Sequence, residues 1–228
     1  MAAILGLVVA SSYAADQEVE KLLSRMRDVY SSSSTARLVI QTTGPRFGKN
    51  TIVTDLTYMK ERRIYAKLSG FESLKGRTRV FICDGQKVQV DDFAGNLQFL
   101  DFNPDIIPLP INLEAMSFWD WRRQLSTSKG SNMEHSSFKL KKGVRWNSKS
   151  WWVLEEKADG QDVYVDYYID PTTALIHRVQ VYDINKRHLI TETVVAKIER
   201  NLKVDPNLFK VKSRVRISVG KKIETGSP

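Results

Sequence analysis

The sequence has few residues of the kinds that carry catalysis or bind metals. It contains one cysteine, Cys83, so no internal disulfide can form. Its histidines, His135, His177 and His188, are scattered and show no HxH or HExxH spacing, which argues against a metal site. A phosphate-binding glycine loop and a GxSxG elbow are also missing. We therefore predict a binding protein with no catalytic residue, metal or cofactor.

Acidic residues are outnumbered by basic ones, and the formal net charge is +9. The excess of lysine and arginine concentrates in residues 122–149 and 197–222. Such regions favour anionic partners, such as lipid head groups or an acidic protein surface, although a merely solvated basic face is equally compatible with them. Nucleic acid is disfavoured, because no RNP-like run of aromatic residues and glycine is present.

The first fifteen residues have no charged side chain, and Asp16 is the first one. Residues 2–10 have the length of a signal-peptide apolar region, and residues 12–14 offer a small-x-small cleavage site, although no lysine or arginine precedes them. The stretch is too short to span a bilayer. We predict a signal peptide over residues 1–14 and a periplasmic mature protein.

Residues 16–30 have helical periodicity. Apolar side chains recur at three- and four-residue intervals from Val19 to Val29, Asp16 is a candidate N-cap, and the serines at 31–34 end the pattern. We predict one amphipathic helix here.

The rest of the chain alternates with a period of two, which predicts nine to eleven antiparallel strands. Asp84-Gly85 predicts a hairpin turn, and residues 170–173 (DPTT) and 205–207 (DPN) predict turns of other kinds, the latter followed by a last strand. The pattern predicts a mainly β (α+β) fold class, with one N-terminal helix and one helical insertion. We predict a single domain over residues 15–221 and a frayed tail at 222–228.

One segment interrupts the strands. Pro104, Pro108 and Pro110 exclude a central strand, and the following residues predict a short helix. The apolar segment 104–125 is the candidate lid of a half-open sheet. Its predicted plug consists of Leu109, Ile111, Met116, Phe118, Trp119, Trp121 and Leu125.

Alternation also gives one face of the early strands as the candidate wall of a ligand site. These residues are Leu38, Ile40, Ile52, Leu56, Tyr58, Ile64 and Leu68. The pattern does not distinguish a cavity wall from a packed core. The tryptophans Trp119, Trp121, Trp146, Trp151 and Trp152 leave the same two alternatives open.

Several stretches together resemble the periplasmic lipoprotein carriers of the LolA type and related lipoprotein-sorting proteins. After the helix come LTYMKERRIYAKLSG and VFICDGQKVQVDD, and far downstream LIHRVQVYD leads to ITETVVAKIERNLKVDPNLFKVK. Asp84-Gly85 and the series Asn201, Asp205, Phe209 match family positions. The family's Arg-Pro after the second strand is replaced by Lys60-Glu61, so no lid-latching residue is assigned.

The resemblance implies an incomplete antiparallel β-barrel wrapped on the N-terminal helix, with a helical lid insertion. It also implies a monomeric carrier that takes the acyl chains of a lipoprotein, or another lipid, into an apolar hollow for transfer towards the outer membrane. Its partners would be an inner-membrane donor and an outer-membrane acceptor, with peripheral membrane contact. The alternative is a periplasmic regulatory or sensor module of the same fold that binds a protein partner.

Overall fold

The alternating segments pair into one large sheet in the computed structural model. The structure describes residues 2–60, 62–72, 75–91, 97–101, 136–158, 163–183 and 185–212, with side chains from Gln17 onward. The elements in chain order are α1 (Ala2–Ser32), β1 (Thr35–Thr43), η1 (Pro45–Phe47), β2 (Ile52–Met59), β3 (Arg63–Ser69), β4 (Arg79–Asp84), β5 (Lys87–Asp91), β6 (Leu97–Asp101), β7 (Ser136–Trp146), β8 (Lys149–Ala158), β9 (Val163–Ile169), β10 (Ile176–Asp183), β11 (Leu189–Arg200) and η5 (Pro206–Phe209).

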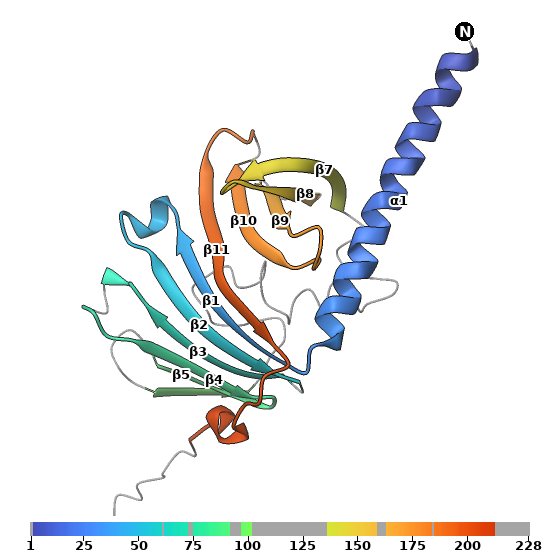
Figure 1. Cartoon of the computed structure of the whole chain (residues 1–228). Coiled ribbons are helices and arrows are strands. Elements are labelled where there is room, and N and C mark those ends of the chain that lie inside the picture. Colours follow the sequence, from blue (N-terminus) through green and yellow to red (C-terminus); the bar gives the residue numbers. More distant parts are fainter. Residues whose placement is uncertain are drawn as a thin grey trace, which may run out of the picture.

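The sheet consists of two meanders joined at β1 and β11, the first and last strands among the described residues. The order is β6-β5-β4-β3-β2-β1-β11-β10-β9-β8-β7, and every neighbouring pair is antiparallel. β1 and β11 pair at the junction of the halves, whereas β6 and β7 are the two edges. The sheet is therefore open, as the predicted incomplete barrel requires (Figure 1).

The two halves differ in curvature, and bulges explain the difference. The pairs from β1–β2 to β5–β6 show no register shift, whereas shifts occur in β1–β11, β10–β11, β9–β10 and β7–β8. At the β7 bulge, Gly143 has a φ of 74°, a conformation that glycine adopts without strain. Bulges bend strands and increase their twist, and β7–β10 accordingly curl over towards α1 (Figure 1).

The helix is longer than predicted. It runs from Ala2 to Ser32, so Asp16 lies inside it and the prediction of an N-cap there was wrong. Residues 2–15 contain no proline, and five of them are alanine, the residue that most favours helix, so nothing stops α1 at Asp16. The predicted end in the serine run is confirmed. Across the described residues, no helix combines the length and apolarity that a membrane crossing needs.

Turn chemistry follows the sequence. The Asp84 carboxylate accepts hydrogen bonds from the backbone N–H groups of Gln86 (2.9 Å) and Lys87 (2.7 Å). Asp170 accepts from Thr172 and Thr173 in the same way, at 2.7 and 2.9 Å. Asp205 caps η5 by accepting from the N–H of Asn207. The strand predicted after η5 extends into 213–228, outside the described residues.

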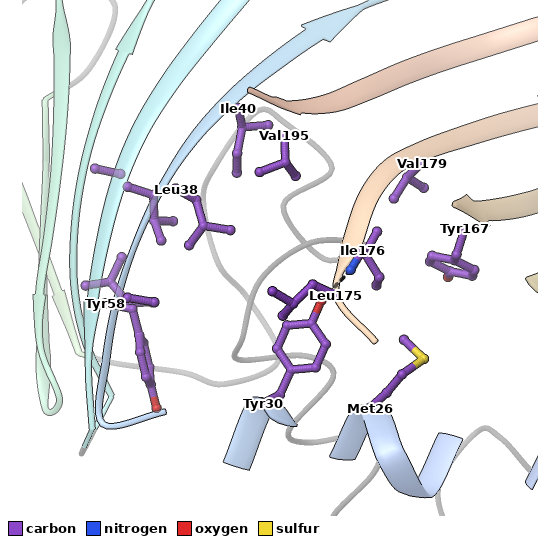
Figure 2. Packing of buried hydrophobic residues seen from close by; sticks show 14 of the residues in the cluster. Met26, Tyr30, Leu38, Ile40, Tyr58, Tyr167, Leu175, Ile176, Val179 and Val195 are labelled. Carbon is purple, nitrogen blue, oxygen red and sulfur yellow. Dashed lines mark hydrogen bonds between the residues drawn. The ribbon is translucent and has the colours of Figure 1, made fainter. Parts of the chain in front are cut away.

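One apolar cluster joins the helix to both halves of the sheet. On the apolar side of α1, Val29 is half-buried against the cluster. The other residues there are buried, namely Val19, Leu22, Leu23 and Met26. Besides these helix residues, the buried members of the apolar cluster include residues of β1–β5 and of β8–β11. Figure 2 shows Met26 and Tyr30 of α1 beside Leu175 and Ile176, with Leu38, Ile40 and Tyr58 on the opposite side. The core therefore lies on the concave face of the sheet.

Candidate functional site

The seven wall residues predicted from alternation lie together on this concave face. Their exposed fractions range from 0% for Leu68 to 4% for Ile64, and all belong to the apolar cluster. The register makes them cross-strand neighbours, with Leu38 opposite Leu56 and Tyr58 opposite Ile64. Cross-strand pairs project to the same face of a sheet, so these side chains form one continuous apolar surface.

A second half of this surface was missed by the sequence reasoning. β8–β11 contribute buried residues to the same cluster, namely Leu154, Tyr167, Ile169, Ile176, Val179 and Val195. Ile40 pairs with Val195, which makes the surface continuous across the junction of β1 and β11. Alternation within each of these strands was the available signal. Only the pairing of β1 with β11 shows that the apolar face of the early strands and that of β8–β11 form a single surface.

The C-terminal part of α1 closes one end of the concave face. The Tyr30 hydroxyl accepts a hydrogen bond from the N–H of Ile176 at 3.0 Å. Arg25 donates to the carbonyl oxygens of Pro171 (2.7 Å) and Thr172, and Arg200 donates to the carbonyl of Val29 at 3.3 Å. The helix end is thereby bound to the β9–β10 turn and to the last strand.

The apolar surface changes character away from the helix end. The inward side chains of β1 are, in order, Ala36, Leu38, Ile40 and Thr42. Thr42 is opposite Thr193 on β11 and Ile52 on β2, and Thr54 on β2 is opposite Ile40. The concave face is therefore apolar near α1 and bears hydroxyl groups at its opposite end.

The predicted plug residues, from Leu109 to Leu125, lie outside the described residues, as does the rest of segment 104–125. Their role as a lid stays a prediction.

Two tryptophans lie on the outer face of the sheet instead of the concave one. Tyr167 and Ile169 are core residues, so Tyr168 between them faces outward. Its ring lies 5.9 Å from that of Trp146, which in turn lies 5.3 Å from Trp151. The guanidinium of Arg178 sits 4.8 Å from the ring centroids of both Trp146 and Tyr168.

Further interactions hold these outer-face residues together. Arg178 forms an ion pair with Glu192, and the indole N–H of Trp151 donates a hydrogen bond to the Trp146 carbonyl at 3.0 Å. Trp152, in contrast, packs against the core on the concave side. Tryptophan content alone therefore does not locate the apolar face.

The titratable groups within the described residues favour structure over catalysis. Burial raises the pKa of the Cys83 thiol to about 11, so the reactive thiolate is scarce near neutral pH. Burial has the opposite effect on His177 and lowers its pKa, which favours the neutral imidazole; the centroid of its ring lies 5.1 Å from that of Trp151. Within the described part of the chain, no group of three or more His, Cys, Asp or Glu side chains is arranged to hold a metal ion.

No protein-family model and no curated protein matches the chain. Among solved structures, it is similar to an uncharacterized conserved protein from Thermus thermophilus, with a TM-score of 0.56, 13% identity, and coverage of 86% of this chain and 96% of that one. It is also similar to MucB in the MucA/MucB complex from Pseudomonas aeruginosa, with a TM-score of 0.48, 12% identity, and coverage of 86% of this chain but 61% of that one.

A LolA superfamily protein from Nitrosomonas europaea gives a TM-score of 0.38 at 9% identity, covering 84% of this chain and 97% of that one. The likeness to all three concerns the fold alone. The architecture itself is an open antiparallel sheet with an N-terminal helix against its concave face, which confirms the predicted incomplete barrel on a helix.

Proposed function

We propose that this protein is a periplasmic carrier that binds the acyl chains of a lipoprotein, or of another lipid, against the concave face of its sheet. The observation that supports the proposal is the single apolar surface formed by both halves of an open sheet and by α1. A closed barrel would have no edges to part, whereas an open sheet can widen to admit a chain. On this proposal the protein binds and transfers its ligand and catalyses no reaction.

The free energy of burying an acyl chain is so large that release of the ligand requires a competitor for the apolar surface. Burial of an acyl chain contributes about 0.8 kcal/mol per CH₂, so a chain of about 16 carbons would gain on the order of 12 kcal/mol. Binding this tight would prevent release. A segment of the protein that covers the same surface in the empty state would offset part of this gain. The apolar segment 104–125 is our candidate, with Phe118, Trp119 and Trp121 as its anchors.

Native mass spectrometry tests the proposal. Protein purified from the periplasm should carry an acylated species whose mass identifies the ligand, and empty protein should take up a diacylated lipopeptide. Because these side chains compete with the ligand, replacing Phe118, Trp119 and Trp121 together by serine should tighten lipopeptide binding and slow its release, with a smaller effect on stability. The control is Ile190→Ser, a surface position that is 38% exposed. A wild-type protein that is empty and refuses the lipopeptide would contradict the proposal.

Basic side chains on and near β7 are candidates for electrostatic contact with the surface of a membrane. Lys139, Arg145 and Lys149 are exposed, and no ion-pair partner for them occurs among the described residues. Lys141 and Lys142 are already paired with Glu155 and Glu18. We propose peripheral, salt-sensitive contact with anionic lipid. Binding to vesicles containing anionic lipid that does not weaken between low and high salt would count against it.

A second candidate, a regulatory module that binds a protein partner, is supported by the edge strand β6. Leu97 and Leu100 on this strand are 46% and 45% exposed, and β6 ends the sheet. Exposed apolar edges accept strands from partner proteins. A pull-down from the periplasm by protein that carries no lipid distinguishes the two functions, since only the module would retain one partner in stoichiometric amount.

A further inference from the structure

Four threonines interrupt the apolar surface at the end of the concave face away from α1. Thr42, Thr54, Thr191 and Thr193 have exposed fractions of 0, 0, 4 and 3%. Thr42 pairs with Thr193 across the β1–β11 junction, and Thr54 pairs with Ile40. Each lies two or four residues from a concave-face residue of its own strand, such as Leu38, Leu56 or Val195, so all four face the core.

Their hydroxyl groups are only partly satisfied. The Thr42 and Thr193 oxygens lie 3.3 Å apart, so one hydroxyl donates to the other. The pair then keeps one proton that can be donated elsewhere. The Thr54 oxygen is buried and has no hydrogen-bond partner among the residues that the structure describes. Because a buried hydroxyl without a partner costs free energy of folding, and valine would fill the same space without that cost, the hydroxyl at position 54 is unexplained by folding alone.

The backbone around these threonines is held tightly. Gly44, directly after β1, has a φ of 155°, and a side chain there would collide with the carbonyl of Ile190 in β11. This close approach places the β1–β2 connection against the strand segment that carries Thr191 and Thr193. We refer to Thr42, Thr54, Thr191 and Thr193 together as the threonine cluster.

We propose that the threonine cluster is a polar subsite that binds the ester or amide carbonyl of an acyl-chain ligand. The Thr54 hydroxyl and the free proton of the Thr42–Thr193 pair donate to the carbonyl oxygen, while the hydrocarbon lies on the apolar surface between this cluster and α1. Ala36 and Thr42 are six residues apart on β1, a span of about 20 Å. The ligand thus has a defined direction, with its carbonyl end at the threonines. This inference rests on the proposed lipid-binding function.

The test compares an ester-linked diacyl lipid with its ether-linked analogue, which has the same chains and head group but lacks the carbonyls. Wild-type protein should bind the ester lipid about tenfold more tightly, as one net hydrogen bond provides. Thr54→Val should lose this preference and be at least as stable to urea. Thr57→Val is the matched control, because Thr57 lies on the same strand but pairs with Tyr65 on the outer face.

Thr54→Ser keeps the hydroxyl and should keep the preference for the ester lipid. Thr42→Val is a second variant, for use if Thr54→Val does not fold. It should also reduce the preference for the ester lipid. Equal binding of ester and ether lipids by the wild type, or a preference unchanged in Thr54→Val and Thr42→Val, would overturn the subsite while leaving lipid binding intact. Failure of the wild type to bind either lipid would overturn the proposed function together with the subsite.

Discussion

The hydroxyl of Tyr30, on the last turns of α1, accepts a hydrogen bond from the backbone N–H of Ile176, 146 residues later in the chain, at 3.0 Å (Figure 2). Both residues are buried, at 5% and 1% exposure. Burial raises the pKa of Tyr30, so the phenol stays neutral over the physiological range. The contact fixes the helix end to the first residue of β10, and so closes the apolar face at that end.

Tyr30→Phe should destabilise the protein, because the N–H of Ile176 would remain buried without an acceptor. We expect the free energy of unfolding to fall by about 1–3 kcal/mol, measured by urea denaturation. Tyr164→Phe is the control: Tyr164 is half-buried and its ring lies beside Lys157 and Lys186, contacts that phenylalanine keeps. Equal stability of Tyr30→Phe and wild type would show that the hydrogen bond does not hold the helix end.

Lys186 connects two carboxylates on the outer face, those of Glu155 and Asp166. Its side chain is 29% exposed, and theirs are 17% and 13% exposed. Removing the cation with Lys186→Met should therefore cost about 1–2 kcal/mol at neutral pH, between the values for surface and buried pairs. The control is Lys203→Met, at an exposed position. A loss at Lys186 no larger than at Lys203 would contradict this account of the cluster.

The same cluster predicts a pH dependence. Burial by itself would raise the pKa of Glu155, but hydrogen bonds from Lys141 and Lys186 outweigh it and lower the pKa below the ordinary 4.5. A carboxyl with a lowered folded-state pKa contributes stability above the unfolded value and loses it as the pH falls through the folded value. Stability should therefore decline below about pH 4.5. Urea titrations of Glu155→Gln should show a shallower decline than wild type in that range; parallel curves would exclude Glu155 as a contributor.

Cys83 should be a reporter of unfolding and not a reactive group. It is completely buried, with a raised pKa of about 11, so a thiol reagent should modify the native protein at least about a hundredfold more slowly than the urea-unfolded chain. A Cys83→Ala protein with Ser137→Cys, at an exposed site, should react at the rate of a free thiol. Rapid modification of native Cys83 would show that β4 opens locally.

Local patterns predicted the elements of this fold well because strands and turns are specified by nearby residues. The Asp84-Gly85 hairpin, the turn at Asp170 and the short helix at Asp205 all follow from side chains that bind their own backbone. The apolar face of β1–β3 followed from period-two alternation, which the burial of Leu38, Leu56 and Leu68 confirms as one face.

Long-range pairing could not be predicted in this way. Thr42 and Thr193 lie 151 residues apart, and neither strand signals the other as its neighbour. The second half of the apolar surface and the threonine cluster both depend on this pairing, so both were missed. The extra turns of α1 were missed for a different reason, since a signal-peptide composition and a helical one use the same residues.

The central claim is that an acyl chain binds the concave face, and photocrosslinking tests it most directly. A lipopeptide with a diazirine within its acyl chain is irradiated with the protein, and the adducts are mapped by peptide mass spectrometry. The account predicts adducts at inward positions such as Leu38, Leu56 and Leu68, and not at their outward neighbours Arg37, Asp55 and Lys67. Adducts confined to the outward positions, or none above the level of an unrelated protein, would contradict it.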